Sequence, residues 1–145
     1  MRGKVAVIGV GMIKYGELFD KSLEDMVQEA YSNCLKDVRK GIDPKEIKAA
    51  WFGQWSGGFI GQGLQSGNSL ASLIGNLDIP VTRLENACAT GGDTFRHACL
   101  GVASGAYDVA LALGAEKMRD KPSAESLGGA GGGGGAEVGI HPAWA

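Results

Sequence analysis

The apolar positions of this chain fall into two patterns, short continuous runs and helical spacings, that alternate along the sequence. Continuous apolar runs rich in β-branched residues predict buried strands at 4–10 and 107–114, and strand-like runs predict two further strands at 49–55 and 81–86. Apolar residues spaced three and four apart predict helices at 22–41, 68–77 and 94–104, with a short helix after residue 43. Strands that alternate with helices indicate an α/β fold built from right-handed βαβ crossovers.

Residues with clear capping roles fix several of the predicted helix ends. Ser22 and Asp25 have the spacing of a capping box, and Pro44 occupies a first helical position. Thr90 is expected to cap the third long helix, and Gly105 to end it. The local signals therefore agree with the apolar pattern.

Cys88 is the candidate catalytic residue, because it lies between a predicted strand and a predicted helix. Unpaired N–H groups and a partial positive charge at a helix N-terminus favour the thiolate, which is the nucleophilic form. Its neighbours are small enough to let a substrate or another backbone approach closely: they are Ala87, Ala89, Gly91 and Gly92. The alternative is that Cys88 is a buried small hydrophobic residue.

The segment at 86–92, NACATGG, resembles the nucleophile segment of the thiolase family, which carries the pattern N-x-C-A-[ST]-G. The resemblance extends from about residue 4 to 119, and is closest to sterol-carrier-type and archaeal acetoacetyl-CoA thiolases, which share a glycine- and glutamine-rich segment like that at 52–67. It implies a layered α/β fold in which helices cover both faces of a mixed, mostly parallel sheet. Residues 1–120 would form the N-terminal thiolase domain, and 121–145 a flexible glycine-rich segment at the start of a lid region.

The resemblance also implies a two-stage acyl transfer. Cys88 would attack an acyl-CoA thioester, and the acyl-cysteine would then undergo Claisen condensation, or thiolysis would run in reverse. Coenzyme A thioesters would be substrates, with no cofactor or metal, and the Cys88 amide is a candidate oxyanion donor. The family's two histidines and second cysteine belong to segments that this sequence lacks, so the chain is expected to need a C-terminal half or a partner. The alternatives are a non-catalytic assembly module and a related condensing enzyme, of the ketoacyl synthase or hydroxymethylglutaryl-CoA synthase type.

The remaining cysteines and both histidines are expected to have no catalytic role. Cys34 and Cys99 lie on the apolar stripes of their helices, which predicts core positions. His97 is held away from Cys88 by its own helix, and is expected to be a surface or packing residue. His141 follows a glycine-rich run, without the surroundings of a base or a metal ligand.

Gly9 and Gly11 follow the first predicted strand, as the glycines of a dinucleotide-binding fingerprint do. Lys14 stands where that fingerprint needs its third glycine, so we expect glycines that only turn the chain.

Composition narrows the choice of partners and compartment. A net charge of −2 gives no basic field for nucleic acid or an anionic membrane. No apolar run reaches the length of a membrane span and no signal peptide is evident, so a cytoplasmic protein is expected. Three cysteines, an odd number, favour a reducing compartment.

Arg83 and Glu85 share one face of the third predicted strand, which is typical of an interface strand. The resemblance implies that this strand pairs across a dimer two-fold axis. We therefore expect a homo-oligomer, or a hetero-oligomer with thiolase-like subunits. A small partner protein is a further alternative.

Overall fold

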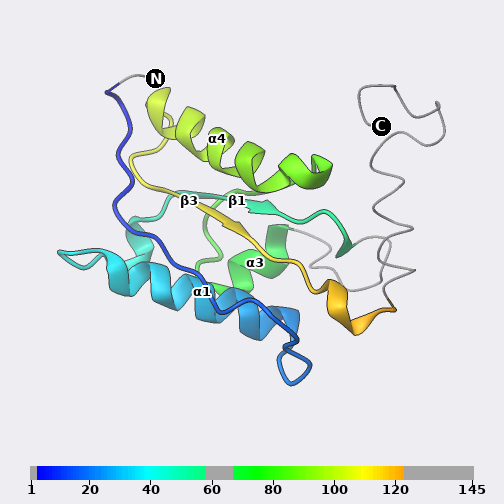
Figure 1. Cartoon of the computed structure of the whole chain (residues 1–145). Coiled ribbons are helices and arrows are strands. Elements are labelled where there is room, and N and C mark those ends of the chain that lie inside the picture. Colours follow the sequence, from blue (N-terminus) through cyan, green and yellow to red (C-terminus); the bar gives the residue numbers. More distant parts are fainter. Residues whose placement is uncertain (1–2, 58–66, 123–145) are drawn as a thin grey trace, which may run out of the picture.

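The computed structural model of the protein describes residues 3–57 and 67–122 (Figure 1). Within these ranges, with η marking a short 3-10 turn, the elements follow in the order α1 (Leu23–Asp37), η1 (Pro44–Glu46), β1 (Ala49–Gly53), α3 (Gly67–Leu73), β2 (Val81–Leu84), η2 (Ala87–Ala89), α4 (Thr90–Ala103), β3 (Ala110–Gly114) and η3 (Met118–Asp120). Three of the four predicted strands and all the predicted helices are therefore present. Most of the glycine- and glutamine-rich segment at 52–67, most of the flexible segment expected at 121–145, and His141 lie outside the described residues.

The three strands form a parallel sheet in the order β2-β1-β3. Trp51 in the central strand pairs with Thr82 on one side and with Ala112 on the other. Helix α4 covers one face of the sheet, and α1 and α3 cover the other (Figure 1). The α/β fold with helices on both faces is thus confirmed.

The core lies between the sheet and the helices α1 and α3. Phe52, Leu70 and Val27 are fully buried there, one from each element. Helix α1 presents its apolar stripe to this core, and the predicted capping box is confirmed, because the Asp25 amide donates to Ser22 Oγ at 3.0 Å. Burial of each large aliphatic or aromatic side chain of this kind contributes about 1.5–3 kcal/mol.

The opposite face of the sheet is packed closely against α4. A Cβ atom added at Gly53 would lie 2.4 Å from Thr94 Oγ1, so the backbones of β1 and α4 approach more closely than larger residues would allow. The buried side chains of Thr90, Thr94 and Ala98 form this contact face of α4. The packing fixes the N-terminal half of α4 over the end of β1.

The prediction of a strand at 4–10 is wrong, because the described chain has no strand there. This segment pairs with no described strand, and Val7, Ile8 and Val10 are each more than half exposed. A strand needs a hydrogen-bonded neighbour, and an apolar groove separates this segment from β3. The βαβ unit predicted to begin here is accordingly absent, although the connections from β1 to β2 and from β2 to β3 join parallel strands.

Gly9 and Gly11 let the N-terminal segment lie against α1. A Cβ atom at Gly11 would be 2.2 Å from the Cys34 backbone nitrogen and 2.5 Å from the Ala30 carbonyl oxygen. The glycines therefore serve close backbone packing, rather than the turn that the sequence indicated.

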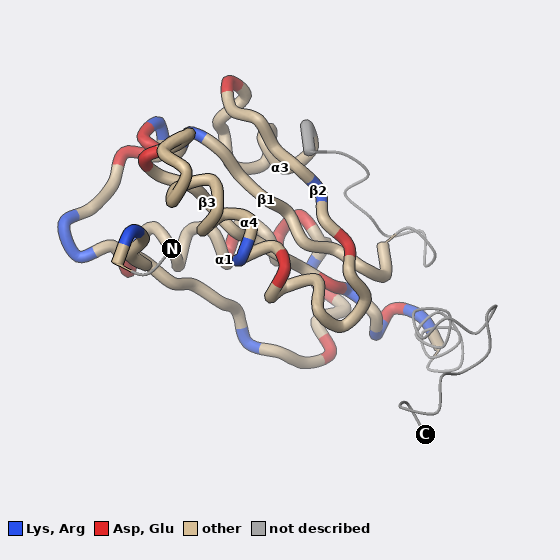
Figure 2. The backbone as a smooth tube through the Cα atoms, turned by 90° about the horizontal axis from the view of Figure 1, so that it is seen from above, with Lys and Arg blue, Asp and Glu red and all other residues tan. Residues whose placement is uncertain are grey.

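Charged residues of both signs are interspersed along the described chain (Figure 2). No helix among the described residues is long and apolar enough to span a membrane.

Candidate active site

The carboxyl ends of the three parallel strands lie at one edge of the sheet, where ligand sites form in open α/β sheets. From this edge β1 continues into residues 54–57, β2 into η2 with Cys88, and β3 into residues 115–117. The structure therefore places Cys88 at the strand-to-helix turn that the sequence predicted, beside two other loops.

The Cys88 turn is held by hydrogen bonds from its neighbours. Thr90 Oγ1 accepts from the Asn86 amide at 2.8 Å and donates to the Ala87 carbonyl oxygen at 2.7 Å. Glu85 Oε1 accepts from the Ala87 amide at 2.7 Å. The Cys88 amide has no hydrogen-bond acceptor within the described part of the chain, so it is available to an incoming oxyanion.

Helix α4 begins at Thr90, four residues before the predicted start at residue 94. The prediction that Thr90 caps this helix is also wrong, since Ala89 is in the N-cap position and Thr90 instead closes the turn before it. Asp93 lies in the first turn of α4. Cys88 is consequently closer to the helix start than the apolar pattern implied.

Ala87, directly before Cys88, has a left-handed backbone conformation with φ of 43°. A side chain at such a position costs on the order of 1 kcal/mol, and strain of this kind gathers at functional turns. The strained peptide directs the chain from β2 into η2 and orients the Cys88 amide.

Replacing Ala87 by glycine is expected to raise the free energy of unfolding by about 0.5–1 kcal/mol, because glycine adopts a positive φ without steric cost. Ala103 is the matched control, since it lies within α4 and has no capping role. Ala103→Gly should lower stability by a similar amount. Urea unfolding of the two variants tests this pair, and equal effects of both substitutions would contradict the strain at Ala87.

Glu116 organises the loop beside the Cys88 turn, and sequence reasoning missed it. Its carboxylate accepts hydrogen bonds from the amides of Trp55 and Ser56 and from the Ser56 hydroxyl, about 60 residues earlier in the chain. On the other side, Arg83 donates to the Gln54 carbonyl oxygen at 3.1 Å. The signal for it in the sequence is an acidic residue two positions after the strand that ends at Gly114, at the edge where the loops meet.

The other sequence candidates lie away from Cys88. His97 contacts Asp93 one helical turn earlier, with Nδ1 at 2.9 Å from the carbonyl oxygen and 3.4 Å from the carboxylate, which confirms a packing role. The prediction that Cys34 and Cys99 are core residues is wrong, because both are only partly buried. Both side chains line an apolar groove. Burial, and secondarily the charge of Asp37, raise the pKa of the Cys34 thiol.

The surface around Cys88 is open. Cys88, Gly91 and Gly92 are exposed, and a Cβ atom added at either glycine would meet nothing within 4 Å. Helical glycine costs about 1 kcal/mol relative to alanine, and packing within the described residues does not require it at these two positions. No group of three histidine, cysteine or acidic side chains in residues 3–57 and 67–122 could hold a metal ion.

Comparisons with known proteins give one family model and several curated relatives. The family model for the N-terminal domain of thiolase matches residues 5–132. The acetyl-CoA acetyltransferase of Methanothermobacter thermautotrophicus is 40% identical over 116 residues, which cover 80% of this chain and 30% of that enzyme. Its counterpart in Methanocaldococcus jannaschii is 43% identical over 127 residues, covering 84% and 31%. A hydroxymethylglutaryl-CoA synthase of Thermococcus onnurineus is 37% identical over 107 residues, covering 72% and 29%.

The chain spans about 30% of the length of the curated relatives it matches. The matched region contains β2, the Cys88 turn and α4, the elements that build the candidate site. The chain belongs to the thiolase family, and it corresponds to the N-terminal domain.

Proposed function

We propose that this chain is the nucleophile-bearing part of a thiolase-type acyl-CoA acyltransferase, with Cys88 as the catalytic residue. The observation that carries the proposal is the exposed thiol of Cys88 at a strand-to-helix turn whose amide is unpaired among the described residues. The relatives named acetyl-CoA acetyltransferase support coenzyme A thioesters as the substrate class.

In the first half-reaction the Cys88 thiolate attacks the thioester carbonyl of an acyl-CoA. A carbon–sulfur bond to Cys88 forms, and the carbonyl electrons move onto oxygen, where the Cys88 amide can donate a hydrogen bond. The intermediate then collapses and coenzyme A leaves as a thiolate, which takes up a proton. The product is an acyl-cysteine.

In the second half-reaction a base removes an α-proton from a second acyl-CoA, and the resulting carbanion attacks the acyl-cysteine. The new carbon–carbon bond gives a 3-ketoacyl-CoA and restores the Cys88 thiolate; thiolysis is the reverse. His97 is engaged with Asp93, and the described site contributes no base to Cys88. We therefore assign the base to the part of a thiolase polypeptide that this chain does not match.

A hybrid enzyme supplies that part for experiments. We define it as the acetyl-CoA acetyltransferase of M. thermautotrophicus in which this chain replaces the region that it matches. The hybrid enzyme can be compared directly with the free 145-residue chain.

The second candidate function is that of a related condensing enzyme, favoured by the 37% identity to a protein named hydroxymethylglutaryl-CoA synthase. Both reactions use an acyl-cysteine, so Cys88 would keep its role. Mass spectrometry of the products formed from acetyl-CoA and acetoacetyl-CoA distinguishes the thiolase reaction from that of the synthase. The third reading, an assembly module without chemistry, requires Cys88 to have no special reactivity.

Iodoacetamide labelling, read by peptide mass spectrometry, tests the enzyme against the module. We expect fast labelling of Cys88, because its thiol is exposed, and slow labelling of Cys34, because a raised pKa leaves Cys34 with less thiolate at any given pH. Preincubation with acetyl-CoA should protect Cys88 alone. Equally slow labelling of all three cysteines would contradict the catalytic proposal.

We also propose that the protein is cytoplasmic. In addition, we propose that β2 pairs with β2 of a second copy of the chain. Among the described residues β2 lies at the edge of the sheet, and Thr82 and Arg83 on it are exposed. Pro80 and Leu84 direct their carbonyl oxygens to β1, so by alternation the Arg83 amide points away from β1 to the free edge.

Arg83→Pro is expected to abolish association, because it removes a backbone donor from the free edge of β2. Arg83→Ala is the matched control, since it loses the same side-chain bond to Gln54 but keeps the amide. Sedimentation of the free chain and the hybrid enzyme at micromolar concentration measures this. Monomers for the unsubstituted proteins, or equal association of both variants, would contradict pairing through β2.

A further inference from the structure

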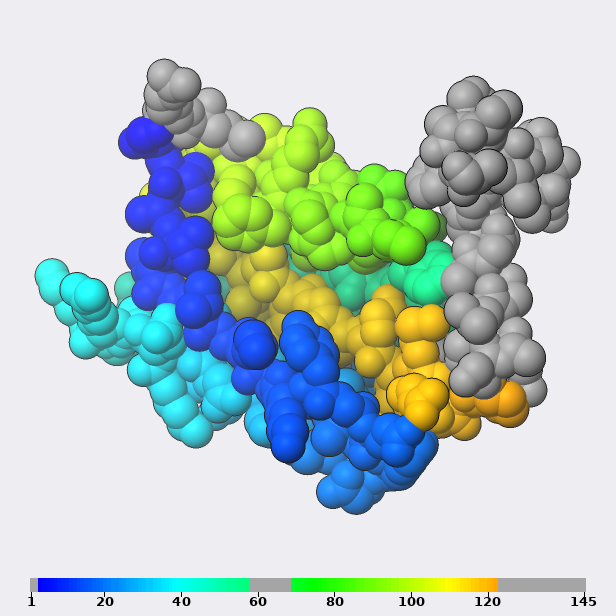
Figure 3. Space-filling model, in the orientation of Figure 1, coloured from blue at the N-terminus to red at the C-terminus, as the bar shows by residue number. Residues whose placement is uncertain are grey.

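The segment that follows β1, residues 54–56, is held from both sides at the carboxyl edge of the sheet. Figure 3 shows this region at one side of the molecule, with the start of α4 in green, the end of β1 below it in turquoise, and the segment after β3 in yellow to orange. The Gln54 amide donates to the Leu84 carbonyl oxygen at 3.2 Å, and Arg83 donates to the Gln54 carbonyl oxygen at 3.1 Å. On the side of β3, Glu116 accepts from the next two amides.

Among the described residues, every group that bonds to the Glu116 carboxylate is a donor. These groups are the Trp55 amide, the Ser56 hydroxyl, and the Ser56 amide, which lies 3.1 Å from Oε2 and 3.3 Å from Oε1. Ser56 is fully buried. A carboxylate offers acceptors to all of these donors, and its hydrogen bonds are about twice as strong as those between neutral groups. Glutamine has one acceptor oxygen and an NH₂ group, so at position 116 it would direct donors at donors.

The end of β1 contacts the residue that closes the Cys88 turn. A Cβ atom added at Gly53 would lie 3.1 Å from Thr90 Cγ2, so the methyl group of Thr90 packs against the β1 backbone. Thr90 Oγ1 in turn accepts from the Asn86 amide and donates to the carbonyl oxygen of the following residue. A shift at the end of β1 would therefore move Thr90, and with it the turn that orients the Cys88 amide.

We propose that Glu116 is a positioning residue for acyl transfer to Cys88. It holds residues 54–56 in place and, through Gly53 and Thr90, fixes the turn from which the Cys88 amide donates to the thioester oxyanion. The inference rests on the proposed function, since it concerns the half-reaction in which Cys88 is acylated. Glu116 itself makes no contact with the substrate, so the thiol should keep its intrinsic reactivity when Glu116 is replaced.

Glu116→Gln in the hybrid enzyme tests this role, with acetyl-CoA as the acyl donor and acid-quenched mass spectrometry of the Cys88 peptide as the measurement. The rate constant of acylation at saturating acetyl-CoA should fall at least about tenfold, because a displacement of about 1 Å can cost about 100-fold. The acetyl-CoA concentration that gives half of this rate should change less than about twofold. Labelling of Cys88 by iodoacetamide should also change less than about twofold, since alkylation forms no oxyanion.

Glu46→Gln is the matched control. Glu46 Oε1 also accepts from a backbone amide, that of Asp43 at 3.0 Å, but it precedes β1 and so lies at the opposite edge of the sheet. The Glu46→Gln hybrid enzyme should be acylated at the unsubstituted rate. In the free chain, hydrogen exchange at the amides of Trp55 and Ser56 should quicken at least about tenfold in Glu116→Gln and stay unchanged in Glu46→Gln.

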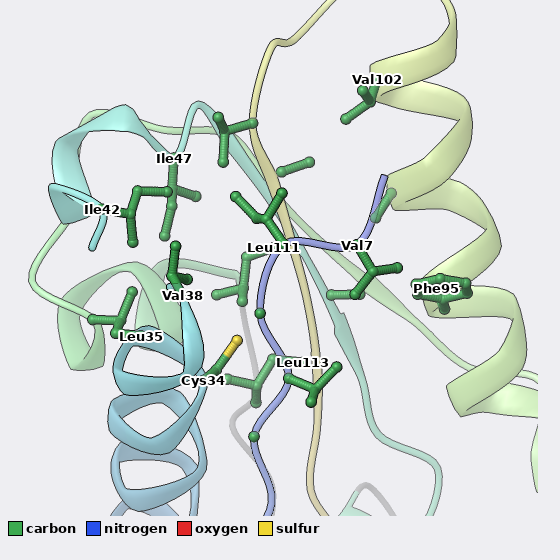
Figure 4. A pocket seen from close by; sticks show the side chains of 18 of the residues that line it. Val7, Cys34, Leu35, Val38, Ile42, Ile47, Phe95, Val102, Leu111 and Leu113 are labelled. Atoms are coloured by element: carbon green, nitrogen blue, oxygen red, sulfur yellow. The ribbon is translucent and has the colours of Figure 1, made fainter. Parts of the chain in front are cut away.

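A second variant and an internal reporter guard against a misfolded protein. Cys34 lines the apolar groove between α1 and β3 (Figure 4), away from Glu116, so N-ethylmaleimide should label it equally in the folded variant and the unsubstituted chain. If Glu116→Gln fails this check, Ser56→Ala decides, because it removes one donor and keeps the carboxylate and both amides. We expect Ser56→Ala to slow acylation about threefold, and an unchanged rate would overturn the proposal.

The remaining outcomes separate this inference from the proposed function. Unchanged acylation in a folded Glu116→Gln variant, or equal slowing by Glu46→Gln, would overturn the positioning role and leave Cys88 as the nucleophile. A lower yield of acylated protein at an unchanged rate constant would mean a purely structural role, and would also overturn it. An unsubstituted hybrid enzyme that is never acylated at Cys88 would refute the proposed function itself, and this inference with it.

Discussion

Replacing Cys88 by alanine is expected to abolish thiolysis of acetoacetyl-CoA by the hybrid enzyme. The loss should be on the order of 10⁴-fold or more, because the substitution removes the atom that forms the acyl bond and leaves only binding and orientation. The fold should be unaffected, since Cys88 is exposed and its neighbours are small. Steady-state assays of coenzyme A consumption measure the effect.

Cys99→Ala is the matched control for this loss. Cys99 lies eleven residues further along, on α4, and lines the apolar groove rather than the Cys88 turn. The Cys99→Ala hybrid enzyme should retain most of its activity, and its unfolding should report any packing defect. Retention of thiolysis by Cys88→Ala, or an equal loss in both variants, would be incompatible with the assigned nucleophile.

The free chain is expected to show no thiolysis of acetoacetyl-CoA, whereas the hybrid enzyme does. General acid and base groups of this kind contribute a factor of about 10² to 10⁴, and the condensation step needs one beside the acyl-cysteine. His97 is held by Asp93, and the Cys88 turn is open. The described residues therefore supply no base beside Cys88, and they do not exclude water from it.

Assays of the two proteins at equal concentration of active thiol test this expectation. The free chain should still acquire an acyl group from acetyl-CoA, slowly, because that step needs only the thiolate and an oxyanion donor. Robust thiolysis by the free chain would show that a base lies within these 145 residues. His97→Ala in the free chain would then identify or eliminate the one histidine among the described residues.

The parts of the fold that depend on local signals could be predicted from the sequence. The capping box at Ser22 and Asp25 and the apolar stripe of α1 are present as expected. The position of Cys88 between β2 and α4 follows from the strand-like run at 81–86 and the break in pattern after it. These features arise within one segment, so neighbouring residues determine them.

The features that the sequence did not predict depend on distant contacts or on strain. Residues 4–10 have strand-like composition, but a strand requires a neighbour that the described chain lacks. The hydrogen bonds of Glu116 to Trp55 and Ser56 join segments about 60 residues apart. The positive φ of Ala87 has no signal in the sequence, because alanine rarely adopts it.

The role of Cys88 as the nucleophile is tested by locating the acyl group on the enzyme. The hybrid enzyme would be mixed with acetyl-CoA, quenched in acid within the first turnover, digested, and analysed by tandem mass spectrometry. We expect an acetyl group on the peptide that carries Cys88, and its loss when coenzyme A is added before the quench. An acetyl group on Cys34 or Cys99 instead, or none on Cys88 while the enzyme turns over, would contradict it.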